Sequence, residues 1–241
     1  MRLLCHNGRG GFDLREFHGN QIPPYAILSH TWGADRDEVT FHDVIEGRGT
    51  EKPGYKKLQF CGQKAYAYKL DYFWVDTCCI NKLSDQELSE SINSMFHWYQ
   101  RAVICFVYLT DFEASHEGPS SARGKGFGKS RWFSRGWTLQ EILAANKAVF
   151  FDSSGRKLGD KCILRESIAA STGISERALR GPEYLRCFGV EERLSWAQYR
   201  QTKREEDMAY SLLGIFDVSM PLVYGEGRNK AYERLFEAVE A

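Results

Sequence analysis

A tryptophan and a glutamate stand one helical turn apart in residues 130–152, which read SRWFSRGWTLQEILAANKAVFFD. Good helix formers follow Leu139, so the middle of this stretch is predicted to be a helix. At about 100° per residue, Leu139 and Ile142 share one face, and Trp137 and Glu141 share the opposite face. A carboxylate beside an indole suits a ligand pocket. The plain alternative is a solvated glutamate on a surface helix.

Small and cationic residues flank that pair. Ala144 and Ala145 are expected to leave room above the helix, and Arg131 and Arg135 precede it. Guanidinium groups bind carboxylates and phosphates through paired hydrogen bonds, which makes both arginines candidates for holding an anionic ligand. Residues 147–151 (KAVFF) then have the composition of a buried strand.

Two further apolar runs end in polar loops. Residues 25–30 (YAILSH) place Ser29 and His30 before a loop with Trp32 and Gly33, and residues 72–76 (YFWVD) end at Asp76. Open α/β sheets bind ligands outside the carboxyl ends of their strands, so these five residues are candidates for ligand binding. Two alternatives stay open: a structural, hydrogen-bonded histidine, and an aspartate that binds the amides of its own turn.

The order of the predicted elements indicates the fold class. Helical spacing in residues 54–69, a capping box at residues 84–87 and an apolar run at 102–109 complete an alternation of strands and helices. This order predicts an α/β fold with a mostly parallel sheet and flanking helices. Mostly helical patterns after residue 152 are expected to pack on it. The Gly- and Ser-rich residues 113–129 are expected to be a lid or poorly ordered.

Composition excludes several classes of function. The chain has 241 residues, 43% of them hydrophobic, and a formal net charge of zero. It therefore lacks the charge that nucleic acids or anionic membranes attract. No apolar run approaches the ~20 residues of a membrane span, and the start is too polar for a signal peptide. We expect a cytoplasmic protein.

The number and spacing of the cysteines also favour a cytoplasmic protein. Seven cysteines without regular spacing argue against a secreted disulfide framework and against a zinc site, so no metal is expected. Cys78 and Cys79 allow one further hypothesis, a hydrolase that pairs a thiol with His30. Adjacent cysteines at a strand end are more often structural, half-buried residues.

Four collinear segments resemble the fungal heterokaryon incompatibility (HET) domain. The resemblance implies one HET domain over residues 1–241, with an α/β core at about 22–152 and a mostly helical C-terminal part at about 160–241 packed on it. The matching segments are YAILSHTWG at 25–33, YFWVDTCCINK at 72–82, SRWFSRGWTLQE at 130–141 and REEDMAYSLLGIFDVSMPLVYGEG at 204–227.

A more distant resemblance connects two of these segments with Toll/interleukin-1 receptor (TIR) domains. ILSHTWGAD at 27–35 resembles the TIR first-strand motif, and GWTLQEIL at 136–143 resembles the TIR helix motif Trp-x-Leu-x-Glu. The resemblance implies a TIR-like, flavodoxin-like sheet. Catalytic TIR domains use that glutamate to cleave the N-glycosidic bond of NAD, and the matching residue is Glu141. Plant TIR domains commonly have Phe and Arg where this chain has His30 and Thr31.

The residue types suit such a reaction. Nicotinamide in NAD is already cationic and leaves without protonation, and an ionised carboxylate stabilises the oxocarbenium-like ribosyl centre. Indoles stack on the bases, and arginines and loop amides hold the pyrophosphate. We therefore expect an NAD nucleosidase (NAD glycohydrolase) that triggers regulated cell death, with NAD as substrate and no cofactor. Glu141 is the expected catalytic residue, and the expected substrate-binding residues are Ser29, His30, Trp32, Gly33, Asp76, Arg131, Arg135 and Trp137.

The alternative is a non-enzymatic TIR-like module that signals cell death by self-assembly. Trp137 and Trp32 are then interface aromatics. The resemblance also implies that activity needs self-association, and that the domain is fused to or activated by a receptor or oligomerisation domain. We expect neither a nucleic acid nor a membrane as partner.

Overall fold

The computed structural model describes residues 1–115 and 126–241. Seven strands form one sheet in the order β2-β1-β4-β3-β5-β6-β7. The strands are β1 (Arg2–His6), β2 (Phe12–Glu16), β3 (Tyr25–His30), β4 (Tyr72–Trp74), β5 (Ile104–Tyr108), β6 (Ala148–Phe151) and β7 (Lys157–Asp160).

The four central strands, β4, β3, β5 and β6, run parallel. The chain moves from β3 to β4 on one side and then to β5 on the other, so the strand order reverses at β3. A crevice forms at such a reversal, outside the carboxyl ends of the strands. The β1–β2 hairpin and β7 add antiparallel pairings at the edges. The predicted α/β fold is therefore confirmed, with a sheet that is parallel at its centre and antiparallel at its edges.

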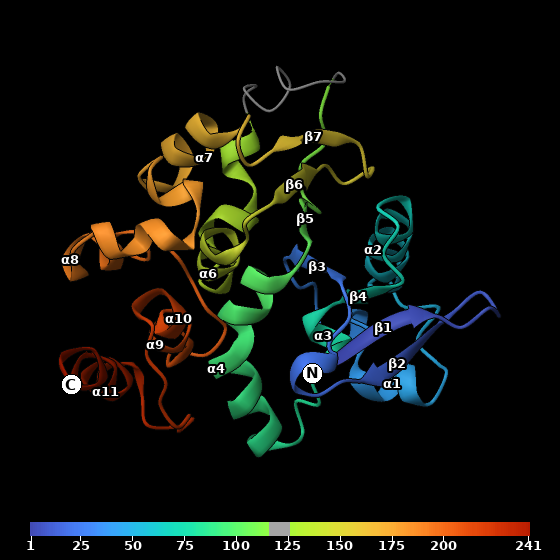
Figure 1. The fold of residues 1–241 in the computed structure, drawn as a ribbon, viewed down its shortest axis with the longest axis horizontal. Helices are drawn as coiled ribbons and strands as arrows, with labels where there is room; N and C mark the ends of the chain where they lie inside the picture. Colours follow the sequence, from blue (N-terminus) through green and yellow to red (C-terminus); the bar gives the residue numbers. More distant parts are fainter. Residues whose placement is uncertain (116–125) are drawn as a thin grey trace.

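Helices cover both faces of this sheet (Figure 1). On one side α2 (Tyr55–Ala67) contacts β3 and β4, while α6 (Trp137–Ala144) contacts β3 on the other side and packs against α4 (Asp85–Arg101). Every residue of β3 is buried, because a strand covered on both faces has no side exposed to water. The remaining helices are α1 (Phe41–Ile45), α3 (Asp76–Cys79), α7 (Arg165–Thr172), α8 (Val190–Ser195), α9 (Asp207–Tyr210), α10 (Leu213–Phe216) and α11 (Arg228–Glu240).

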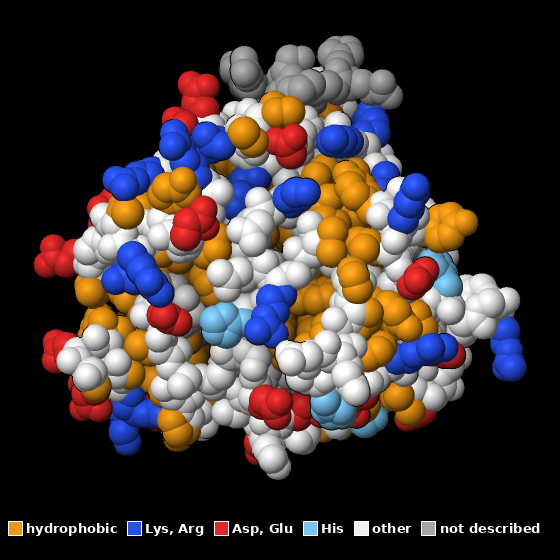
Figure 2. Space-filling view, in the orientation of Figure 1, with side chains coloured by type: hydrophobic (Ala, Val, Ile, Leu, Met, Phe, Trp, Pro, Cys, Tyr) orange, Lys and Arg blue, Asp and Glu red, His pale blue; other side chains and the backbone are white. Residues whose placement is uncertain are grey.

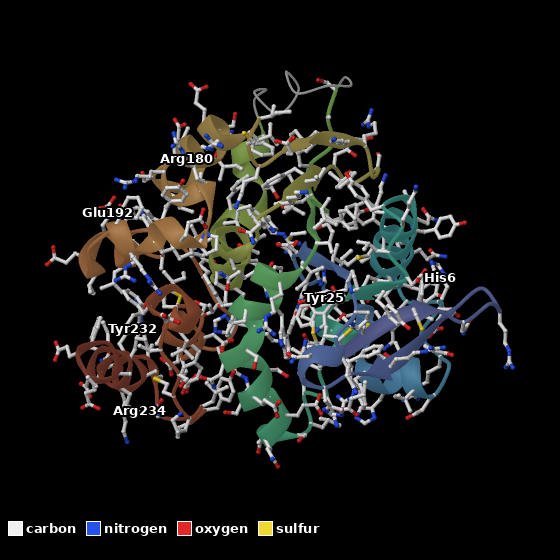
Figure 3. The ribbon with its side chains drawn as sticks, viewed as in Figure 1. His6, Tyr25, Arg180, Glu192, Tyr232 and Arg234 are labelled. Atoms are coloured by element: carbon white, nitrogen blue, oxygen red, sulfur yellow. The ribbon has the colours of Figure 1, made fainter. Side chains whose placement is uncertain are left out.

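The C-terminal helices pack on the α/β core, as the sequence predicts. α10 contacts both α4 and α6. Gly214 of α10 allows this approach, because a Cβ at that position would collide with the ring of Phe96 in α4. α11 packs on α9, and the Tyr232 hydroxyl donates a hydrogen bond to the carbonyl oxygen of Met208 at 3.3 Å (Figure 3).

The predicted boundaries of the core, residues 22–152, are too narrow. Leu3 and Leu4 of β1 are fully buried, and β1 joins the sheet beside β4. β7 extends the other edge through its pairing with β6. The glycines of residues 1–21 misled the prediction, because Gly8 and Gly10 have positive φ and form the β1–β2 turn. The α/β part thus covers residues 2–160.

The segment expected to be a lid, residues 113–129, lies partly outside the described residues. Its two described ends are packed. The Ala114 amide donates to Asp152 at 3.2 Å, and Phe127 is 1% exposed with its ring against Phe133 and Phe150. Both described ends of this segment are therefore anchored to the core.

Charges of both signs are interspersed over the face shown in Figure 2, in agreement with the zero net charge. Within residues 1–115 and 126–241, no helix has both the length and the apolar character needed to cross a membrane.

Candidate functional site

A pocket of about 570 Å³ lies at the carboxyl ends of the central strands. β3 contributes its last residue, His30, and β4 is followed at once by Asp76, so the crevice predicted from strand order is present. Side chains of α1, α4, α6 and residues 203–224 complete the walls. Six predicted site residues line it, namely His30, Trp32, Asp76, Arg135, Trp137 and Glu141.

The helix α6 is buried on more sides than its sequence predicts. All of its residues after Trp137 are buried, including both the aliphatic face and Glu141. Its start is closed by the C-terminal part: the Gly136 amide donates to the Gln201 carbonyl at 2.8 Å, and a Cβ on Gly136 would collide with Thr202. The expected free space beside Ala144 and Ala145 does not exist, because both residues are buried in the core.

The carboxyl group of Glu141 is held mainly in its protonated form. Burial raises its pKa to about 8, and the negative charge of Asp76 adds to this. The neighbouring hydroxyl groups of Ser29 and Tyr99 lower the pKa in part. The residue is 7% exposed, and its Oε2 atom has no hydrogen-bond partner within the described residues. The expectation of a glutamate that is ionised at neutral pH is therefore wrong for this environment.

Asp76 orients the loop that follows β3. His30 Nε2 donates to Asp76 Oδ1 at 2.9 Å, and Trp32 Nε1 donates to Asp76 Oδ2 at 2.8 Å. Burial raises the pKa of Asp76, but the Lys82 charge and the His30 hydrogen bond outweigh burial and hold that pKa well below its usual range. Asp76 is therefore a carboxylate that fixes two aromatic side chains at the pocket.

Cations surround the Trp32 ring. Lys82 Nζ lies 3.6 Å from its centroid and the guanidinium carbon of Arg135 lies at 5.5 Å. A cation close to an aromatic face is attracted by the ring quadrupole. Lys82, which was not among the predicted site residues, therefore also lines the pocket. Nδ1 of His30 is buried and unpartnered in the part of the chain that the structure describes.

The C-terminal part supplies residues that sequence reasoning missed. Asp207 accepts hydrogen bonds from Trp137 Nε1 at 3.2 Å and from the Tyr224 hydroxyl at 2.9 Å, and Arg204 lies 4.0 Å from the Tyr224 ring centroid. Burial raises the pKa of Asp207. These residues belong to the last segment that resembles the HET domain, which is the one sequence feature that could have marked them as functional. Nothing in the sequence predicts that they lie next to Trp137.

Three predicted binding residues do not line the pocket. Ser29 is fully buried and its hydroxyl accepts a hydrogen bond from Trp132. Gly33 is exposed, and its amide donates to Glu38 at 2.6 Å. Arg131 is exposed and pairs with Asp111 at 3.5 Å, so its assignment to ligand binding is corrected.

The hypothesis of a cysteine hydrolase is wrong, because both candidate thiols are buried. Cys78 and Cys79 are both buried, and desolvation raises the pKa of Cys78 to about 12, so its thiol stays protonated. The Cys78 thiol donates to the Val39 carbonyl oxygen at 3.1 Å, which is a structural role. Across the described ranges there is no group of three or more side chains that could hold a metal ion.

The fold and the pocket define an α/β domain with a candidate ligand site at the strand-order reversal, lined by a buried carboxyl group and two indoles. The family model described as heterokaryon incompatibility protein (HET) matches residues 25–126. The chain is also 48% identical, over 243 residues, to vegetative incompatibility protein HET-E-1 of Podospora anserina. It therefore carries a HET domain, which confirms the resemblance of the four segments to that family.

That alignment covers 99% of this chain but 18% of the Podospora protein, so the chain spans less than a fifth of the length of this curated relative. No solved structure matches the chain.

Proposed function

We propose that this chain serves fungal heterokaryon incompatibility as a TIR-like domain that hydrolyses the bond between nicotinamide and ribose in NAD. The incompatibility role is supported by the HET match and by the Podospora relative. The NAD-cleaving role is carried by one observation: the buried Glu141 carboxyl group lines the pocket with an unpartnered oxygen in the described structure. Its position matches the glutamate of the TIR helix motif.

The cationic nicotinamide ring activates Glu141 on binding. A positive charge nearby favours the ionised form of a carboxyl group, so the pKa of Glu141 falls and its proton passes to solvent. The C–N bond then breaks and its electron pair neutralises the nicotinamide. The carboxylate stabilises the ribosyl cation until a water oxygen bonds to the ribose carbon and releases a proton.

Two indoles are suited to hold the nicotinamide base next to Glu141. Trp137 is half-buried and lines the pocket, and Asp207 fixes its ring by the hydrogen bond to Nε1. Trp32 is fixed in the same manner by Asp76. Rings held by carboxylates lose little freedom when a flat ligand stacks on them, so the binding site is preorganised.

Arg135 and Arg204 are suited to hold the pyrophosphate. Both line the pocket, and in the described part of the chain neither has a carboxylate within ion-pair distance. Guanidinium groups bind phosphate oxygens in pairs. Arg204 thus takes the role that the sequence suggested for Arg131.

The test is to incubate the purified domain with NAD and identify the products, for the wild type and for Glu141→Gln. Loss of the carboxylate is expected to slow NAD cleavage by about a hundredfold or more. Glu192→Gln is the matched control, since Glu192 is exposed on α8 (Figure 3). The assay is run at several protein concentrations, because the TIR resemblance implies self-association. Well-folded proteins that leave NAD intact at every concentration would overturn the NAD-cleaving role and favour the assembly alternative.

A further inference from the structure

The pocket is long, and α4 gives its direction. Leu88, Ile92 and Met95 line it on successive turns of this helix. The next residue on the same stripe is Tyr99, whose hydroxyl donates to the Leu28 carbonyl oxygen at 2.8 Å and lies close enough to Glu141 to lower the pKa of its carboxyl group. At a rise of 1.5 Å per residue, Leu88 lies about 16 Å from Tyr99 along the helix axis. The pocket therefore extends from the Glu141 end toward the start of α4.

The end of the pocket remote from Glu141 is formed by α1 and the first turn of α4. Arg2 connects these two helices, because its guanidinium group pairs with Glu87 of α4 and lies 4.7 Å from the centroid of the Phe41 ring of α1. Phe41 of α1 therefore lies near the first turn of α4, and the His42 ring centroid lies 5.3 Å from that of Phe41. We call this region the far end; its lining residues are Phe41, His42, Leu83 and Leu88.

Three of the four far-end residues are apolar, and the fourth, His42, has an unused ring nitrogen. Nε2 of His42 is buried without a hydrogen-bond partner in residues 1–115 and 126–241. Most buried polar groups in proteins are hydrogen-bonded, so an unpartnered ring nitrogen in a pocket indicates a ligand atom that pairs with it. Leu83, which is 81% exposed, stands at the rim as an apolar side chain without cover.

We propose that the far end binds a second aromatic base, so that the pocket takes a dinucleotide in preference to a mononucleotide. This inference rests on the proposed function and names the part of NAD that lies away from the scissile bond. A flat base packs against Phe41 and Leu88, and its edge forms a hydrogen bond with His42. About 16 Å between the two ends exceeds the reach of a single nucleoside along α4.

Binding of AMP tests the far end without any reaction, because AMP carries the second base and no nicotinamide. Calorimetry on the wild type and His42→Ala is expected to show AMP binding that is weakened about tenfold by the substitution. Leu88→Trp fills the far end and is expected to abolish AMP binding. His97→Ala is the matched control, since His97 is exposed on α4 and does not line the pocket. Melting curves establish that each variant is folded, and Leu88→Trp keeps the test valid if His42→Ala does not fold.

Cleavage kinetics give a second, independent test of the far end. We expect His42→Ala to reduce kcat/KM for NAD about tenfold and to leave cleavage of nicotinamide mononucleotide unchanged. Equal AMP binding by wild type and His42→Ala, or no AMP binding by the wild type, overturns the far-end proposal. A wild type that binds AMP but cleaves neither substrate supports the far end and overturns the proposed function. If the wild type cleaves NAD and the mononucleotide equally well, the proposed function is supported and the far-end proposal is overturned.

Discussion

The indole nitrogen of Trp132 donates a hydrogen bond to the hydroxyl oxygen of Ser29 across 2.8 Å, and both side chains are fully buried. An indole N–H only donates, so the serine oxygen accepts and its own hydrogen is left for another partner. That partner is Glu141: burial raises the pKa of its carboxyl group, and the Ser29 hydrogen bond opposes the shift. Trp132 and Ser29 therefore favour the ionised form of Glu141 without touching the pocket.

Ser29→Ala is expected to move the pKa of Glu141 further above about 8, because it removes a hydrogen bond to the ionised form. A hydrogen bond to a charged group is worth about 1.5–3 kcal/mol, or roughly one to two pH units. The pH profile of kcat/KM for NAD measures this. Superimposable profiles for wild type and variant would remove Ser29 from the control of Glu141.

Wild-type kcat/KM for NAD is expected to rise with pH and to level off above about pH 8. The rising limb follows the ionised fraction of Glu141, whose pKa is raised to about 8 by burial, so the rate grows about tenfold per pH unit below that value. Initial rates between pH 5.5 and 9.5 measure it. A rate that falls over this range would show that the protonated acid is the active form.

Glu141 is also expected to make the stability of the fold depend on pH. Its pKa rises from 4.5 to about 8 on burial, so the folded state holds a proton that the unfolded state has lost between these values. The stabilising effect is complete below about pH 4.5 and is lost as pH rises through about 8.

Urea denaturation at pH 5 and pH 8.5 measures this effect. The wild type is expected to lose on the order of a few kcal/mol more unfolding free energy than Glu141→Gln, which has no proton to release. The other ionisable groups titrate alike in both proteins, so their contributions cancel in the difference between the two losses of unfolding free energy. Parallel losses would mean that Glu141 is better solvated than its burial indicates.

Arg135→Gln and Arg204→Gln are each expected to raise KM for NAD about tenfold and to change the melting temperature little. Each arginine lines the pocket without a carboxylate partner among the residues described, so its charge is available to the pyrophosphate. Arg131→Gln is the matched control, because Arg131 is exposed and pairs with Asp111 outside the pocket. An equal rise in KM for all three variants would point to a general charge effect.

Lys57→Met is expected to destabilise the fold by about 3–5 kcal/mol, because it leaves the buried carboxylate of Glu38 unpaired. Both side chains are buried; Lys57 pairs with Glu38 and also donates to the Thr31 carbonyl at 3.0 Å. Thermal and urea denaturation measure the loss. The double variant Lys57→Met with Glu38→Leu is expected to recover most of it, and a double variant as unstable as Lys57→Met would contradict this explanation.

Local sequence patterns determined the elements that carry the pocket. Periodicity and the Ser84 cap define α2 and α4, and the apolar runs define β3 to β6. Because ligands bind at the carboxyl ends of parallel strands, the sequence alone places His30, Trp32 and Asp76 at one edge of the sheet. These predictions succeed because side-chain period and capping depend only on near neighbours in the chain.

The tertiary structure decided the chemistry of those residues. Glu141 and Trp137 lie on the predicted helix, yet the protonation of Glu141 depends on its burial in the folded chain, and the orientation of Trp137 depends on Asp207, 70 positions further along the chain. Arg131 and Arg135 are one turn apart in sequence, but one pairs at the surface and the other lines the pocket. Burial, pKa and hydrogen-bond partners are properties of contacts between distant segments, and the periodicity of one segment contains no information about them.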